Sequence, residues 1–170
     1  AIGSAALGNN VTGMGNIALG YLALSMNTTG SSNVALGSET LRLNTSGQSN
    51  VAVGPTALYN NTTGSRNTEV GPGALAANTI GNLNQAVGDY ALNANTTGDN
   101  NTAIGTRALW KNTTGANNVA VGQDTLYENV GGLYNLAIGV SALYYAQNSS
   151  YNIGVGSAAL FLHTTGFQNL

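Results

Sequence analysis

Hydrophobic and polar positions recur along this chain with a period of seventeen residues. An aliphatic residue followed by glycine marks the same place in ten consecutive units, at Gly3, Gly20, Gly37, Gly54, Gly71, Gly88, Gly105, Gly122, Gly139 and Gly156. Ten units of seventeen account for all 170 residues without an insertion or deletion. Such a fixed period is typical of a solenoid, in which each unit stacks only on its neighbours. The pattern predicts a single domain over residues 1–170, cut from a longer array.

Each unit contains a run of five residues whose character alternates, as in Asn50-Val51-Ala52-Val53-Gly54. Period two predicts a short β-strand. We expect the aliphatic pair to face a core and the small residues to leave the other face narrow enough for close packing. Since stacked strands lie about 4.8 Å apart, ten coils predict a rod of roughly 48 Å.

A leucine follows each strand glycine at a constant distance, which predicts one inward-pointing side chain per coil. Eight of these leucines lie in the middle of the array: Leu24, Leu41, Leu58, Leu75, Leu92, Leu109, Leu126 and Leu143. For the segment from leucine to the Asn-Thr-Thr-Gly corner we favour a strand or irregular arc, with a single helical turn as the alternative. The corner glycines, such as Gly47, are expected to supply a positive φ. The predicted fold is a mainly all-β, parallel β-solenoid or β-roll of ten coils.

Asparagine precedes the strand in every unit and forms the most regular polar row. Its members are Asn16, Asn33, Asn50, Asn67, Asn84, Asn101, Asn118, Asn135, Asn152 and Asn169. Amides stacked at the repeat spacing can hydrogen-bond one another or cap the turn backbone. We interpret this row as structural.

Threonine pairs form a second row at the corners, at Thr28-Thr29, Thr62-Thr63, Thr96-Thr97, Thr113-Thr114 and Thr164-Thr165. A flat threonine array would suit an ice surface. Adjacent threonines in a strand, however, point to opposite faces, and the row is interrupted at Val130-Gly131 and Gln147-Asn148. Turn chemistry is the favoured interpretation.

Aromatic residues occupy one repeat position in four consecutive coils, at Trp110, Tyr127, Tyr144 and Phe161. An aromatic stripe of this kind is a candidate for stacking on sugar rings. The favoured interpretation is a subunit contact, or packing that shields the core.

The composition argues against several functions. Charged residues make up 6% of the chain, and four Lys and Arg residues with a net charge of −2 argue against nucleic-acid binding. The absence of cysteine excludes disulfides and thiolate metal sites, and no apolar run is long enough to span a membrane. His163 has no catalytic partner at a recognisable spacing, and the acidic residues are scattered. We therefore expect no enzyme activity, no cofactor and no metal.

The units Asn101 to Gly115 and Asn50 to Gly64 resemble the N-x-A-[IV]-G-x-x-A-L-x-x-N-T-T-G repeats of bacterial and phage fibre proteins. Their strand portion is also similar to the head repeats of trimeric autotransporter adhesins, which are β-rolls packed as homotrimers. The resemblance implies an extracellular, cell-surface or virion fibre segment.

Low charge favours self-association. The sequence predicts a non-enzymatic structural or adhesive module that forms the shaft or head of a fibre. Its expected partners are copies of itself, in a trimer or other cyclic bundle, and glycans or receptors on a host or prey surface. The alternative is a monomeric solenoid that recognises glycan or ice through its aromatic or threonine rows.

Overall fold

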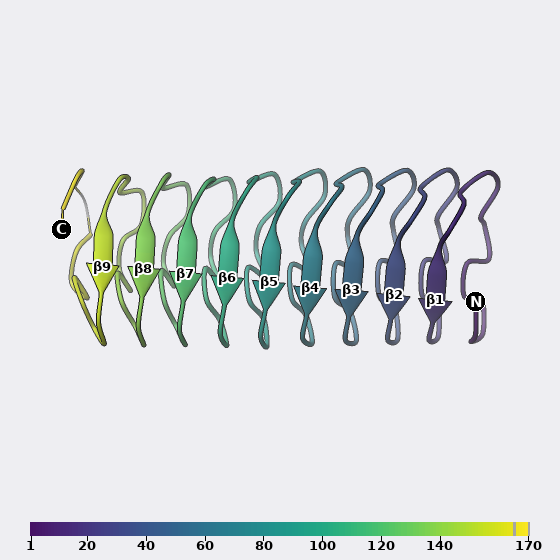
Figure 1. Ribbon diagram of the computed structural model, residues 1–170, viewed down its shortest axis with the longest axis horizontal. Coiled ribbons are helices and arrows are strands. Elements are labelled where there is room, and N and C mark those ends of the chain that lie inside the picture. Colours follow the sequence, from purple (N-terminus) through teal and green to yellow (C-terminus); the bar gives the residue numbers. More distant parts are fainter. Residues whose placement is uncertain (165, 170) are drawn as a thin grey trace.

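The computed structural model describes residues 1–164 and 166–169, so Thr165 of the last threonine pair and Leu170 lie outside the described residues. The described chain is an all-β solenoid with nine strands in one parallel sheet, ordered β1 to β9 (Figure 1). The strands are β1 (Ile17–Leu19), β2 (Val34–Leu36), β3 (Val51–Val53), β4 (Thr68–Val70), β5 (Gln85–Val87), β6 (Thr102–Ile104), β7 (Val119–Val121), β8 (Leu136–Ile138) and β9 (Ile153–Val155). The predicted β-solenoid is confirmed.

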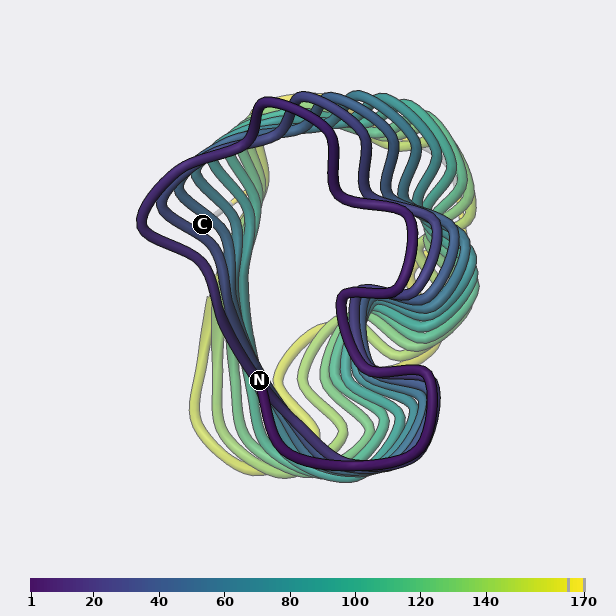
Figure 2. The ribbon, with the colours of Figure 1, turned by 90° about the vertical axis from the view of Figure 1, so that its right-hand side faces the viewer.

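The sheet register follows the sequence period. Each strand residue pairs with the residue seventeen positions later, as Ala18 pairs with Ala35. Viewed along the rod in Figure 2, the coils lie one behind another with a gradual rotation, and the sequence runs from one end of the rod to the other (Figure 1). Residues at one repeat position therefore form continuous rows along the rod.

The strand faces are the reverse of the prediction. The central residue of each strand, usually alanine, points inward, so Ala35 and Ala52 are fully buried, while Val51 and Val53 lie on the outer face and are only partly covered. The interior beside the strand is narrow. A Cβ placed on Gly154, which takes the alanine position in β9, would lie 3.1 Å from Leu143 Cγ. An inward side chain larger than alanine therefore competes with the leucine for space.

The inward leucines are confirmed, because all eight from Leu24 to Leu143 are fully buried. The segment that carries them is an irregular arc without the alternative helical turn. Leu58 has a φ of 53° and Thr56 a φ of 57°, both in the left-handed region. The Leu58 N–H donates to Ala74 O of the next coil at 3.0 Å. Burial and inter-coil hydrogen bonds thus offset a left-handed backbone that costs roughly 1–2 kcal/mol per residue.

The corner glycines from Gly13 to Gly132 do not have the positive φ that we expected of them, as Gly47 illustrates, whereas Gly166 has a φ of 152°. Glycine is needed there for space. A Cβ on Gly47 would overlap Asn44 Oδ1 and the carbonyl oxygen of Gly64. Ser149 replaces the corner glycine in the one coil where Ala146 replaces the asparagine, so the crowding amide oxygen is absent.

Candidate functional site

Two rows of buried asparagines line the interior of the corners. In the predicted row, Asn33 Nδ2 donates to Asn16 Oδ1 at 3.2 Å and to Gly47 O at 2.9 Å. Both alternatives, bonding between amides and bonding to turn carbonyls, therefore occur together. A second row runs through Asn27 and Asn44, whose amides are joined at 2.8 Å. Sequence analysis missed this row, although its seventeen-residue spacing was visible.

The threonine pairs do not form a flat array. Thr62 donates its hydroxyl to Thr79 O of the next coil at 2.9 Å and is partly buried, whereas Thr63 is exposed. The exposed threonines that remain, such as Thr97 and Thr114, belong to a row that is interrupted by Ile80, Gly131 and Asn148. This arrangement favours the turn interpretation over ice binding.

The outer face of the sheet is a regular apolar surface that runs along the rod. Its second row is aliphatic in all nine strands: Leu19, Leu36, Val53, Val70, Val87, Ile104, Val121, Ile138 and Val155. Its first row is aliphatic except at three consecutive strands: Ile17, Val34, Val51, Thr68, Gln85, Thr102, Val119, Leu136 and Ile153. Neither row contains a charged residue. We call these eighteen residues the aliphatic face.

The predicted aromatic stripe is brought together as a continuous row of rings in contact, which we call the aromatic column. The ring centroids of Trp110 and Tyr127 lie 4.9 Å apart, as do those of Tyr127 and Tyr144, the latter pair nearly parallel. Phe161 continues the column 5.3 Å from Tyr144. All four side chains are partly exposed, so the column is accessible from solvent along one side.

Two ion pairs between neighbouring coils flank the aromatic column. Arg107 Nε lies 2.8 Å from Asp124 Oδ1, and Lys111 Nζ lies 2.8 Å from Glu128 Oε1. The hydrogen bond to Glu128 raises the pKa of Lys111, and desolvation raises the pKa of Tyr144. Sequence analysis treated the acidic residues as scattered and missed both pairs, which the seventeen-residue spacing joins.

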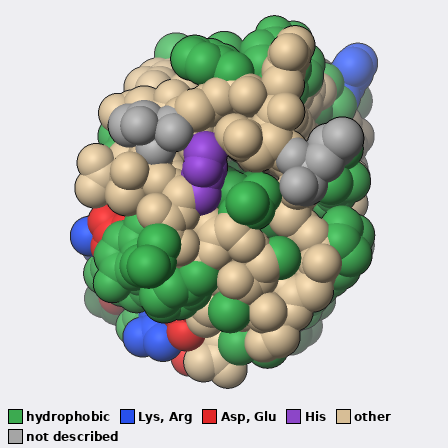
Figure 3. Space-filling model, turned by 90° about the vertical axis from the view of Figure 1, so that its left-hand side faces the viewer, with side chains coloured by type: hydrophobic (Ala, Val, Ile, Leu, Met, Phe, Trp, Pro, Cys, Tyr) green, Lys and Arg blue, Asp and Glu red, His purple; other side chains and the backbone are tan. Residues whose placement is uncertain are grey.

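Charged groups are few on the surface as a whole. Figure 3 shows the C-terminal end of the rod, where Lys, Arg, Asp and Glu side chains lie beside a hydrophobic group on one side. Elsewhere in that view a Lys or Arg side chain projects at the upper right and a histidine lies near the centre, among uncharged polar atoms, backbone and hydrophobic groups. Large electrostatic fields therefore contribute little to recognition by this protein.

A pocket of about 450 Å³ opens at one end of the aromatic column. Its lining comes from two neighbouring coils: Asp89, Tyr90, Asn93, Thr106, Arg107 and Trp110. Of the predicted aromatic residues, Trp110 belongs to this pocket, whereas Tyr127, Tyr144 and Phe161 do not line it.

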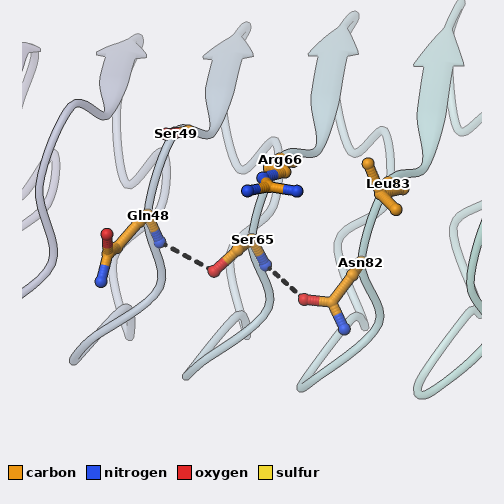
Figure 4. Close-up of a pocket in the computed structure, with 6 residues that line it drawn as sticks. All are labelled: Gln48, Ser49, Ser65, Arg66, Asn82 and Leu83. Carbon is orange, nitrogen blue, oxygen red and sulfur yellow. Dashed lines mark hydrogen bonds between the residues drawn. The ribbon is translucent and has the colours of Figure 1, made fainter.

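A second, more polar pocket of about 320 Å³ lies on the segments before β3, β4 and β5 (Figure 4). Ser65 Oγ accepts the Gln48 N–H at 3.0 Å, and Asn82 Oδ1 accepts the Ser65 N–H at 2.9 Å. In Figure 4 these side chains point towards the preceding coil, and Arg66 projects from the same segment. The side-chain oxygens are used in joining coils, so this pocket is mainly a corner of the scaffold.

Glu69 occupies the inward alanine position of β4. Its side chain is fully buried, and neither carboxylate oxygen has a hydrogen-bond partner. Desolvation raises its pKa well above the usual value, so the neutral acid is the favoured form. Within residues 1–164 and 166–169, no group of acidic or histidine side chains is placed to hold a metal ion. Glu69 thus stands as an isolated buried acid.

The described part of the chain has no helix of the length and apolarity needed to cross a bilayer. No family model, curated protein or solved structure matches the chain. The surfaces that this protein offers to a partner are chiefly the aliphatic face and the aromatic column.

Proposed function

We propose that this protein is a structural module that associates with copies of itself through the aliphatic face. The observation that carries the proposal is the second row of that face, which is aliphatic in every strand from β1 to β9 and has no charge beside it. Several members are substantially exposed, for example Val70 at 43%. Contiguous apolar surface of this kind marks an interaction site more often than a solvated face.

A second copy of the chain is the occupant that fits this face best. Both copies carry the same coil spacing, so the side-chain rows of one copy match the grooves of the other along the whole rod. The face brings no charges that would be buried without a partner, and the net charge of −2 opposes association only weakly. Coil-to-coil matching is therefore maintained over any number of repeats.

The area of the face indicates how assembly depends on length. Nine strands at about 4.8 Å, each about 10 Å long, give a plane of roughly 430 Å². A stable complex buries about 800 Å² per partner. Association through this face alone is therefore weak for few coils and strengthens with each added coil, which suits a long shaft. A closed bundle, trimeric or of another cyclic order, increases the buried area of each copy further.

A fibre shaft or head on a cell surface or virion is the setting in which such a module would serve. The resemblance of the repeats to fibre proteins supports this assignment, as does the very low charge. The proposed role is non-enzymatic, and the buried asparagines of the interior serve to join coils. Binding of surface glycans or receptors is a second candidate, favoured by the pocket beside Trp110.

The test places charge in the middle of the aliphatic face. The double substitution Val87→Lys and Ile104→Lys adds two positive charges in adjacent strands, and we expect it to abolish association because burying them unpaired is costly. The measurement is the solution mass by light scattering and sedimentation across a concentration series. A wild-type protein that remains monomeric throughout would overturn the proposal.

The matched control is Thr97→Lys with Thr114→Lys, which adds the same charge in neighbouring coils at the exposed corner row. We expect this variant to associate as the wild type does. Equal loss of association in both variants would show that net charge, and not the aliphatic face, governs assembly.

A further inference from the structure

We propose that the pocket between the arcs after β5 and β6 binds one pyranose ring of a carbohydrate, stacked on the indole of Trp110. The site goes beyond self-association and lies on a different part of the coil from the aliphatic face. The proposal rests on how the pocket is opened, on the aromatic surface that it presents, and on the polar groups at its rim.

The pocket opens because side chains on one side of it lean towards the preceding coil. Tyr90 packs its ring over Gly73, where an added Cβ would lie 2.7 Å from Tyr90 Cε1. Asn93 is held in the same direction, because its Nδ2 donates to Gly73 O at 2.8 Å. The repeat position of Gly73 runs from Ala5 to Ala158 at intervals of seventeen residues, and Gly73 is the one glycine among these described residues. The leaning of Tyr90 over a glycine is therefore specific to one coil.

Side chains on the other side lean towards the following coil. The Trp110 ring packs against Tyr127 with the two planes tilted by 32°, and the Arg107 guanidinium lies 5.7 Å from the Tyr127 ring centroid. Arg107 Nη2 also donates to Asp124 Oδ2 at 3.0 Å. The regular stacking of side chains along the rod is therefore interrupted between Tyr90 and Arg107, and between Asn93 and Trp110.

The interruption leaves an aromatic surface available to a ligand. Tyr127 lies in the coil after Trp110 and Asn93 in the coil before it, so the indole face turned away from Tyr127 borders the pocket. In the coil before Trp110, the repeat position of the aromatic column is occupied by Asn93, which is not aromatic. A flat ring placed there would extend the column by one member.

The chemistry of the pocket fits a sugar. A pyranose ring presents an apolar C–H face, which suits the indole, and equatorial hydroxyls, which need donors and acceptors at the edge. The Asp89 carboxylate, the Thr106 hydroxyl and the Asn93 amide supply such groups from the two coils. The rim carries one negative and one positive residue, Asp89 and Arg107, and Arg107 is already engaged by Asp124. A neutral polyhydroxylated ligand therefore fits better than an anion.

The volume sets the size of the ligand. About 450 Å³ lies within the range of small-molecule sites and leaves room for one sugar ring and its hydration water. The next coil in that direction offers no further aromatic residue at the same position, because Ala76 stands there. A single ring on one aromatic surface predicts weak binding for each site, which adhesion by many copies in a fibre would strengthen.

The experiment uses the whole chain and a panel of methyl glycosides of glucose, galactose, mannose and N-acetylglucosamine. Trp110 is the sole tryptophan, so its fluorescence reports directly on a ring that stacks against it. Saturation-transfer NMR on the same glycosides gives a readout that does not depend on tryptophan. We expect at least one glycoside to change the fluorescence and to receive saturation.

Two variants place the binding at this pocket. Trp110→Ala is expected to weaken binding at least tenfold, and Gly73→Ala to weaken it as well, because the new Cβ displaces Tyr90 towards the pocket. The matched control is Tyr59→Ala. Tyr59 occupies the position of Trp110 three coils earlier, where Arg42 Nη1 donates to its hydroxyl at 2.8 Å and the residue does not line this pocket.

Three results would overturn the proposal: no glycoside binds, Tyr59→Ala weakens binding as much as Trp110→Ala, or choline binds while the glycosides do not. The last result would identify a cation site formed by the rings and Asp89. The variant Asp89→Asn separates these two chemistries, and it leaves the interior unaffected because Asp89 is exposed. We expect this variant to retain sugar binding within tenfold and to lose cation binding. The variant with lysines at positions 87 and 104 should still bind glycoside, so failure of assembly and failure of this site are distinguishable.

Discussion

Glu69 allows a sharp test of the narrow interior. The change is Glu69→Gln, which keeps the shape of the side chain and removes its ionisation. In the wild type the carboxyl is fully buried without a hydrogen-bond partner, and burial raises its pKa well above 4.5. The folded protein therefore retains a proton that the unfolded chain releases once the pH exceeds 4.5.

The sign and size of the effect follow from proton linkage. The unfolded state binds fewer protons than the folded state between pH 4.5 and the raised pKa, so the free energy of unfolding falls as the pH rises. The slope is about 1.4 kcal/mol per pH unit inside this window. Below pH 4.5 the contribution is fully present, and above the folded pKa the loss is complete.

The assay is urea unfolding of wild type and Glu69→Gln at a series of pH values from about 5 to about 8, with amide exchange of β3, β4 and β5 as a local readout. We expect the Gln variant to gain stability relative to wild type as the pH rises. Other acids titrate in both proteins, so the difference isolates Glu69. Glu69→Ala should remove the same slope with a different offset. Parallel pH curves for wild type and both variants would refute the reasoning.

Two further predictions concern packing. Leu92→Ala should lower the free energy of unfolding by about 2–5 kcal/mol because it empties a fully buried position. The control Leu162→Ala, at an exposed residue, should change it little. Equal effects of the two variants in urea unfolding would contradict the inward assignment of Leu92. Gly64→Ala should lower the free energy of unfolding by about 1–3 kcal/mol, since its Cβ would lie 2.5 Å from Gly81 O. The control is Thr63→Ala at the neighbouring residue. Equal thermal melting of the two variants would contradict the close approach.

Much of the architecture is predictable from the chain because the period is uninterrupted. A glycine and a leucine at constant spacing predict a strand and an inward side chain in each coil; nine strands from β1 to β9 and eight fully buried leucines from Leu24 to Leu143 were found where the pattern indicated. The row beginning at Asn16 is likewise visible in the sequence, and its hydrogen bonds follow from the stacking of like amides. In a parallel stack, an uninterrupted period also fixes the register.

Other features depend on space that a pattern does not measure. Alternation in Val51-Ala52-Val53 says that two faces differ, but the side that is buried depends on the room left beside the leucine. The corner glycine Gly47 illustrates the same limit. A close approach of neighbouring atoms and a positive φ both require glycine, so the sequence does not distinguish them. Both expectations, for the buried face of the strand and for the φ of the corner glycine, were wrong because the sequence does not give the space available in the interior.

The candidate sites divide in the same way. Sequence placed Trp110 and Tyr127 in one row, since residues seventeen apart must lie on neighbouring coils. Only the tertiary structure decided that Tyr90 leans over Gly73 while Trp110 leans the other way, which opens the pocket between them. The repeat determines which residues are neighbours along the rod. The direction in which each side chain leans depends on its packing against both neighbouring coils at once, and only the tertiary structure contains that information.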